Sequence, residues 1–310
     1  MSETLSPDYA LSSTLVDCPL PYNSEYNDKV HLTARLSNAP HTDAINKVYA
    51  TARVVVGKNS VDIDLDNTPT VALNDSWREK SGLIIPTIHE VQARHLPGIS
   101  NISGGTVLAT DHGNNFITLR RDVGAPSFAG YLIEPCGRCG EVPSVTMNAE
   151  LDEELFVLRS FHNEWRIVSF VDDQKPLASS ALIERQVGIL KNKLIDLNLD
   201  PEALLTRPVE PVAMRWSEAD FRAAKEITVR VGDRILEQFR AIAWFDSENN
   251  TLEMRRSMIV EMPRHEMDRE KVMIFDGDGF GRAVVMGTRK ALSAEPCTPF
   301  LKRYLTQNLG

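Results

Sequence analysis

The chain has 310 residues, of which 42% are hydrophobic and 25% charged, so it has enough apolar side chains to bury a sizeable core. Its formal net charge of -9 disfavours nucleic acid as a partner, because nucleic-acid binding needs basic patches. The sequence has no apolar run of about 18 residues, no signal-peptide layout at its start and only four cysteines, so we expect a reduced, cytoplasmic protein that does not enter a membrane.

The first 98 residues predict an arm followed by a strand-containing domain. Residues 1–30 are rich in Ser, Pro, Asp and Asn, as in an irregular arm. The stretch Val48–Leu65 is β-branched and partly alternating, and a Gly-Lys-Asn turn in its middle makes it a predicted hairpin. Residues 87–96 predict a short helix, which ends at a Pro-Gly pair.

From residue 99 onward, predicted strands alternate with helices. The stretch "TVLATDHGNNFITLRR" predicts two strands around a turn, and "AGYLIEPCG" predicts another short strand. The acidic segment that follows has helical periodicity, because Met147, Leu151, Leu155 and Leu158 fall on one face of a helix.

Residues 175–238 are expected to form a helical insertion. An apolar seam runs along its first helix, through Ile183, Val187, Leu190, Leu194 and Leu197. Such a seam must be buried, so we expect it to pack on the core and to contribute to a dimer interface or cover a cleft. The alternative, that these helices belong to the core itself, stays open.

The remainder predicts a hairpin at 239–263, two strands around the loop "DGDGFG", and a closing helix at 299–309. In the preceding insertion, Ser217 and Asp220 have the spacing of a capping box.

Three glutamates of the acidic segment are candidates for chemistry. Since helical residues advance by about 100° each, Glu150, Glu153 and Glu154 lie on one arc beside the leucine face. Like charges at this spacing repel each other, and a bound cation would remove the repulsion. Mg²⁺ is typically held by one or two carboxylates together with substrate phosphates. By itself, however, such a string is more often a solvated acidic face.

The surrounding pattern resembles the Nudix box, in which Gly, five residues, Glu and seven residues precede Arg-Glu-apolar-x-Glu-Glu-x-Gly-apolar. Here Glu141 is followed by seven residues and then by "AELDEELFV". The upstream "PCGRCGE" is similar to a shortened form of the family's glycine loop, two residues too short between Gly137 and Glu141. Ala149 stands where the family has an arginine that braces the loop and the glutamates, and Phe156 stands where it has a glycine.

The resemblance implies an α/β (α+β) fold of the Nudix type. This would be an α/β/α sandwich at 99–310, with the N-terminal strand-containing domain at 1–98 and the helical insertion at about 175–238. It also implies that Glu150, Glu153 and Glu154 bind metal and act in catalysis. The carbonyl of Gly137 would complete the metal shell, and Glu141 would be structural.

The implied activity is hydrolysis of a diphosphate bond in a nucleoside diphosphate linked to another moiety, with Mg²⁺ or Mn²⁺ as cofactor. The implied partner is therefore a small-molecule nucleotide, and a homodimer is a further expectation. Arg120 and Arg121 leave the preceding strand near the site and are candidates for contacting phosphate, or else surface arginines. The alternative function, favoured by Ala149 and Phe156, is a catalytically degenerate module that binds a nucleotide or a protein.

Other motifs in the chain are weaker. Cys136 and Cys139 form a C-x-x-C, but a zinc site needs a second pair and a redox site should open a helix. His89 and His95 are six residues apart, which does not fit a zinc-protease helix. The loop that begins at Asp276 lacks the twelfth-position glutamate of a calcium loop, although Asp276 or Asp278 is a candidate extra acid for the metal site.

Overall fold

The structure is a computed structural model that describes residues 30–37, 49–70, 99–110, 114–123, 128–139, 142–161, 164–246, 251–261 and 272–307. Within these ranges the chain is a mixed α+β protein in which strands dominate. It divides into two compact units, each assembled from three stretches of sequence. The first unit takes Met1–Gly104, Gly137–Thr146 and Ala223–Arg255, and the second takes Gly105–Cys136, Met147–Arg222 and Arg256–Gly310.

Several predicted features fall on residues that the structure does not describe. These are the arm at 1–30 except for Val30, the helix at 87–96 with its two histidines, and Glu141. The predicted domain boundary between residues 98 and 99 stays a prediction. Among the described helices, none has the length and apolar character needed to cross a membrane.

The first unit contains a mixed sheet. Its strands are β1 Val30–Ser37, β2 Tyr49–Val56, β3 Ser60–Thr70, β11 Lys225–Val231 and β12 Arg234–Asp246, with parts of β4 Ile99–Thr110 and β13 Thr251–Val260. The predicted hairpin is confirmed, because β2 and β3 pair antiparallel and Gly57 N donates to Ser60 O over 2.8 Å. On β3, Val61 and Ile63 are fully buried while the intervening Asp62 is not, which is the period of two expected of a strand.

The second unit combines a mixed sheet with helices. Its strands are β5 Asn115–Arg120, β6 Leu132–Ile133, β8 Leu155–Phe161, β9 Glu164–Val171, β10 Glu210–Trp216, β14 Val272–Asp276 and β15 Ala283–Thr288. Its helices are α4 Ser180–Asp196, α5 Pro201–Thr206, α6 Glu218–Ala223, α7 Arg289–Ser293 and α8 Pro299–Thr306. Helix α3 Pro143–Glu154 and strand β7 Cys136–Arg138 contribute residues to both units.

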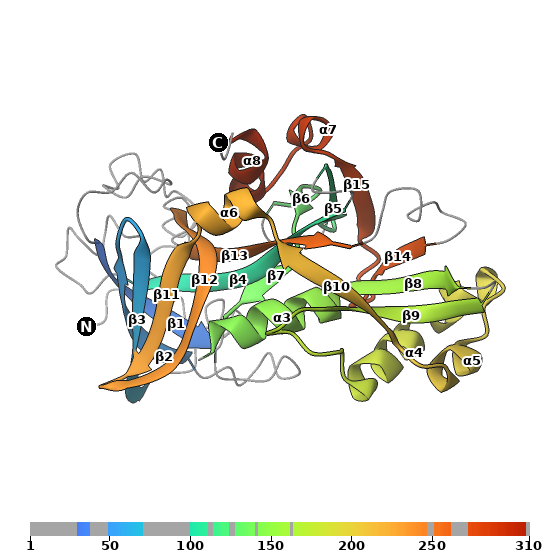
Figure 1. The fold of residues 1–310 in the computed structure, drawn as a ribbon, viewed down its shortest axis with the longest axis horizontal. Coiled ribbons are helices and arrows are strands. Elements are labelled where there is room, and N and C mark those ends of the chain that lie inside the picture. The colour runs from blue at the N-terminus through green and yellow to red at the C-terminus, as the bar shows by residue number, and fades with distance from the viewer. Residues whose placement is uncertain are drawn as a thin grey trace, which may run out of the picture. The chain divides into compact units, whose positions relative to one another are not determined.

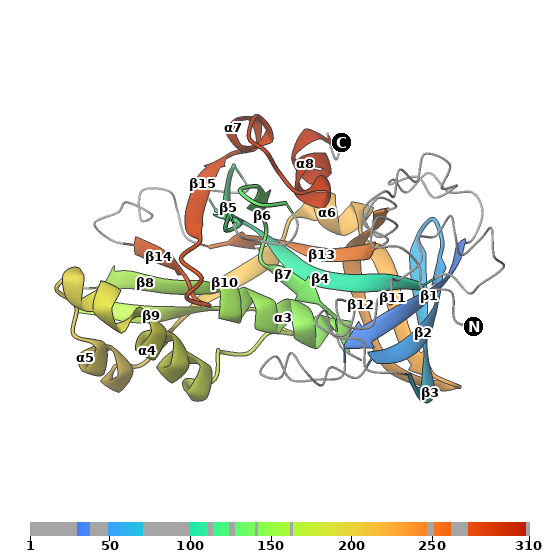
Figure 2. The same cartoon turned by 180° about the vertical axis from the view of Figure 1, so that it is seen from behind.

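The first four residues of strand β8, Leu155–Leu158, are apolar and buried, with side chains packed on both faces of the strand. It pairs antiparallel with β14 on one side and with β9 on the other. Leu155 and Val157 belong to a core cluster with residues of β4, β5, β9, β10 and β13, and Phe156 and Leu158 belong to a second cluster with α4 and α5. Figures 1 and 2 show α4 and α5 together on one side of β8 and β9.

The predicted helical face extended too far along the chain. Helix α3 ends at Glu154, and Leu155 and Leu158 lie in β8 instead. The physical reason is pairing: both edges of β8 have partners that satisfy its backbone groups, and its apolar run suits a strand with two buried faces.

The seam of α4 is confirmed for four of its five residues. Ile183, Val187, Leu190 and Leu194 are buried against β8 and β9, while Leu197 follows the helix end and is exposed. The seam is therefore covered within one chain, and its burial requires no second copy. The homodimer stays a prediction that this seam does not support.

The prediction of a helical insertion at 175–238 is wrong beyond residue 206. Only α6 is helical there, and β10, β11 and the first part of β12 are strands. Strand β11 alternates buried and more exposed side chains at its start and is rich in β-branched residues, which favours a strand over a helix. Asp220 does not serve the predicted capping box; its carboxylate accepts hydrogen bonds from the hydroxyls of Ser257 and Tyr304.

Candidate functional site

Helix α3 is fixed at both ends by side chains distant in sequence. At its start, Ser144 donates from its backbone N (3.3 Å) and its hydroxyl to the carboxylate of Glu237, in the first unit. This satisfies a free N–H and places negative charge at the positive end of the helix. At its end, Gln186 Nε2 donates to the carbonyls of Asp152 (2.7 Å) and Glu153 (3.1 Å).

Gly277 completes this C-terminal cap. Its backbone N donates to the carbonyl of Glu154 over 3.0 Å. A Cβ at position 277 would lie 2.3 Å from Gln186 Nε2 and 2.4 Å from the carbonyl oxygen of Glu153. The close approach of the loop to the end of α3 therefore requires glycine.

One side of α3 is held by buried cations of the second unit. Arg256 Nη2 donates to Asn148 Oδ1 over 2.7 Å, and Lys175 Nζ lies 2.7 Å from Asp152 Oδ1. Both cations are almost completely buried, and Arg256 also pairs with Asp172 over 3.2 Å. Since Asn148 and Asp152 are four residues apart, these contacts fix the rotation of α3 about its own axis.

The predicted glutamates lie on the final turns of this helix. Glu150 and Glu154 are 6% and 7% exposed, and Glu153 is half-buried. The helical conformation that puts the three carboxylates on one arc is confirmed by the bounds of α3. Their role in metal binding and catalysis stays a prediction.

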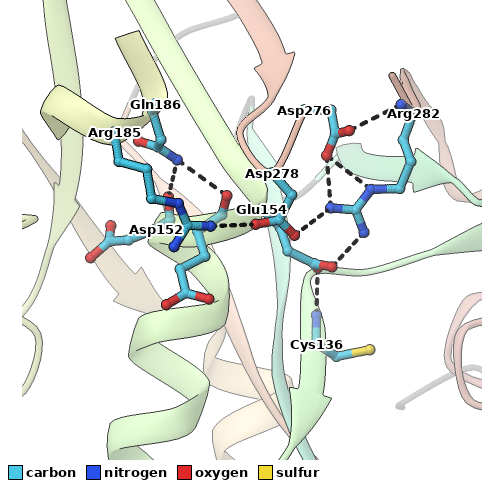
Figure 3. A network of polar contacts seen from close by, with 9 residues as sticks. Cys136, Asp152, Glu154, Arg185, Gln186, Asp276, Asp278 and Arg282 are labelled. Atoms are coloured by element: carbon cyan, nitrogen blue, oxygen red, sulfur yellow. Dashed lines mark hydrogen bonds and ion pairs between the residues drawn. The ribbon is translucent and has the colours of Figure 1, made fainter. Parts of the chain in front are cut away.

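Glu154 is bound through both of its carboxylate oxygens. Oε2 accepts a hydrogen bond from the backbone N–H of Cys136 over 2.8 Å, and Oε1 lies 2.5 Å from Nη1 of Arg282 (Figure 3). Arg282 is 128 residues away in sequence. Strand pairing brings the two together, because β14 pairs with β8 so that Asp276 stands opposite Leu155, the residue after Glu154.

Arg282 also gathers the two aspartates of its own loop. Its Nε donates to Asp276 Oδ1 over 2.9 Å, its backbone N donates to Asp276 Oδ2 over 3.0 Å, and its Nη2 lies 3.0 Å from Asp278 Oδ2. Figure 3 shows the guanidinium between these aspartates and Glu154. A second, more exposed cation, Arg185 of α4, lies 3.5 Å from Asp278.

The cluster has an excess of negative charge in a buried place. Burial and the neighbouring carboxylates, of which Glu154 acts most strongly, raise the pKa of Glu150 to about 8. Burial raises the pKa of Glu154 to about 7, although Arg282 and the Cys136 N–H oppose the shift. Burial likewise raises the pKa of Asp278. A pKa near neutrality suits a group that gives and takes protons.

The other predicted site residues lie in β7 and β5. Gly137 is half-buried in β7, directly after Cys136, and belongs to the first unit. Arg120 Nη1 donates to the carbonyl of Gly130 (3.0 Å), and its Nη2 pairs with Glu295 (3.3 Å). The backbone N of Arg121 donates to the carbonyl of Tyr131. The Arg120 contacts are those of a surface arginine.

Sequence reasoning found Asp276 and Asp278 only as extra acids and missed Arg282 and Gln186. The available signal was the glycine-rich, acidic loop between two strands, which ends in an arginine. The structure also locates the two residues at which the sequence departs from the Nudix pattern. Phe156, in place of the box glycine, is buried against Phe275, and Ala149 is half-buried on α3.

The cysteine hypothesis finds little support here. Cys136 lies in a strand rather than at a helix start, and Cys139 is fully buried. A redox pair needs accessible sulfur atoms.

Comparison with protein-family models, with curated proteins and with solved structures finds no match for the chain.

Proposed function

We propose that the chain is a Nudix-type hydrolase that cleaves a diphosphate bond of a nucleoside diphosphate linked to another moiety. The observation that carries the proposal is the meeting of two buried helical glutamates, Glu150 and Glu154, with an acidic loop that supplies Arg282. An α/β/α sandwich around α3, a cytoplasmic location and a small nucleotide as partner are parts of the same proposal.

Arg282 supports the proposal because it supplies what Ala149 lacks. An arginine at the box position would brace the loop and the glutamates from the helix itself. In this chain a guanidinium from the loop after β14 binds Glu154, Asp276 and Asp278 at once. The Cys136 N–H on the other oxygen of Glu154 leaves that carboxylate little freedom to rotate.

The donor set fits a hard divalent cation held in part by substrate. Within the described ranges, no three His, Cys, Asp or Glu side chains are arranged around one metal position. Mg²⁺ commonly takes only one or two carboxylates and completes its shell with water and phosphate oxygens. Glu150 and Glu153 would hold Mg²⁺ or Mn²⁺, with Glu154 as a third candidate. When bound, the ion would lower the pKa of a coordinated water and screen the charge of the diphosphate.

The chain's own residues supply orientation and proton transfer. Of the three glutamates, one that is not used as a metal ligand would be placed to accept a proton from the attacking water. The cations Arg256 and Lys175 and the cap from Gln186 hold α3 so that this carboxylate keeps its position.

A screen with matched variants tests the proposal. Wild type is incubated with several classes of nucleoside diphosphate derivative in Mg²⁺ or Mn²⁺, and nucleoside monophosphate is detected as phosphate after phosphatase treatment. Glu150→Gln resembles the protonated carboxyl, so the variant should fold and lose at least about 100-fold in rate, as expected for loss of a metal ligand or a general base. Glu154→Gln should abolish turnover, and Glu202→Gln, exposed on α5, is the control. Turnover by both site variants at the wild-type rate would exclude this site.

The degenerate module is the second candidate. It is favoured by Arg282, because its guanidinium already pairs with Glu154 in the way that a bound metal ion would. It predicts nucleotide or protein binding without turnover, and binding that Glu150→Gln leaves unchanged.

A further inference from the structure

The loop that carries Arg282 also presents an aromatic ring to solvent. Phe280 is 68% exposed, although the aspartates on its N-terminal side and the arginine on its C-terminal side are held in the buried cluster. An exposed aromatic side chain in a loop is common by itself. Here the loop on both sides of Phe280 is held in place by these contacts, so the ring is held in an exposed position.

Glycines with left-handed backbone conformation flank the ring on both sides. Gly279 has a φ of 76° and Gly281 a φ of 72°, values that L side chains rarely adopt. A Cβ on Gly279 would lie 2.3 Å from Cγ2 of Ile189 on α4, so the loop packs tightly against that helix. Because Arg282, Asp276 and Asp278 fix one part of the loop and Ile189 fixes another, Phe280 is presented on a rigid support.

The ring adjoins the charged cluster directly. The guanidinium carbon of Arg282 lies 5.8 Å from the centroid of the Phe280 ring, within the range of a cation–π contact. The same guanidinium binds Glu154. Ile189 is itself exposed beside Gly279, so the exposed apolar side chains of Phe280 and Ile189 lie next to the residues that hold the acidic cluster.

We propose that Phe280 is a stacking platform for the base of a nucleotide whose diphosphate lies at the glutamates. The inference rests on the proposed function for the position of the diphosphate. Aromatic side chains bind bases face to face and tolerate any base, because every base has a π-face. This favours a nucleoside, with its planar base, over an isoprenoid or inositol group on the diphosphate. It also makes Phe280 a determinant of substrate affinity, with no part in proton transfer.

Binding, measured separately from turnover, tests the inference. The affinities of ADP and of inorganic pyrophosphate for the full chain are measured by calorimetry, with Mg²⁺ and with a chelator. Phe280→Ala should weaken ADP binding by about 5- to 150-fold, the range expected for loss of one stacked base. Pyrophosphate binding should be unchanged, since it has no base to stack. In the hydrolysis assay the variant should raise KM for nucleotide substrates by a similar factor while kcat stays near wild type.

Matched variants separate stacking from general apolar contact. Phe280→Trp should keep ADP affinity, whereas Phe280→Leu, which keeps an apolar side chain but loses the π-face, should behave like the alanine variant. Phe221→Ala, at another exposed phenylalanine of the second unit, should leave ADP binding unchanged.

The outcomes distinguish the two proposals. ADP binding that is equal in wild type and Phe280→Ala overturns the stacking role, whatever the turnover. Stacking-dependent ADP binding without hydrolysis of any nucleotide overturns the hydrolase and keeps the platform. A wild-type chain that binds neither ADP nor pyrophosphate overturns both.

Discussion

Replacing Arg282 by methionine removes a cation that touches three carboxylates of the cluster. In the native chain the side chain of Arg282 is 10% exposed, and the side chains of Glu154 and Asp276 are 9% and 4% exposed. Removal of one partner from a buried ion network typically costs about 3–5 kcal/mol, because the remaining charges stay buried without compensation. For a unit of this size, that loss corresponds to a fall in Tm of roughly 6–20 °C.

The measurement is chemical denaturation of wild type and variants in a chelator, followed by far-UV circular dichroism. Arg185→Met is the matched control, because Arg185 is 45% exposed and lies 3.5 Å from Asp278. Exposed pairs of this kind contribute about 0–1 kcal/mol. As the pH falls from about 8 to about 5, the loss of unfolding free energy in Arg282→Met should become smaller, because Glu154, whose pKa is raised to about 7, becomes protonated and then needs no counter-charge. Equal unfolding free energies for the two variants would refute the reasoning. So would a loss of unfolding free energy in Arg282→Met that does not change with pH.

Two further predictions concern backbone space and a buried lysine. Gly277→Ala should lower the unfolding free energy by at least about 1–3 kcal/mol, because its Cβ would clash with the cap on α3. Gly188→Ala, where a Cβ meets nothing within 4 Å, should stabilise the protein by up to about 1 kcal/mol. Chemical denaturation of both variants measures the two changes. An unchanged unfolding free energy in Gly277→Ala would show that the cap on α3 does not require glycine at this position. Burial lowers the pKa of Lys225 from its ordinary 10.5 to about 8, so between these values the unfolded chain binds more protons and stability rises with pH. The rise should amount to about 3 kcal/mol and be missing from Lys225→Met; parallel pH profiles of wild type and variant would show that Lys225 is not the cause.

Local periodicity in the sequence determined several elements. The alternation of Val61 and Ile63 with acidic residues is enough for a hairpin strand, because burial on one face of a sheet imposes a period of two. The spacing from Ile183 to Leu194 is enough for α4, because the helical period selects one buried stripe. The same reasoning failed at Leu155, where a strand buried on both faces and a buried helix look alike in sequence.

The glutamate string predicted an acidic helix but left the end of that helix and its surroundings open. Whether Glu150 and Glu154 face solvent or a buried cluster depends on what packs against α3, and the sequence around them is compatible with both. Only the tertiary structure decided this. The pairing of β14 with β8 places Asp276 opposite Leu155, and that register carries Arg282 to Glu154 across 128 residues of chain. A contact of this kind depends on strand register and not on spacing along the chain, so no local pattern could have predicted that Arg282 binds Glu154.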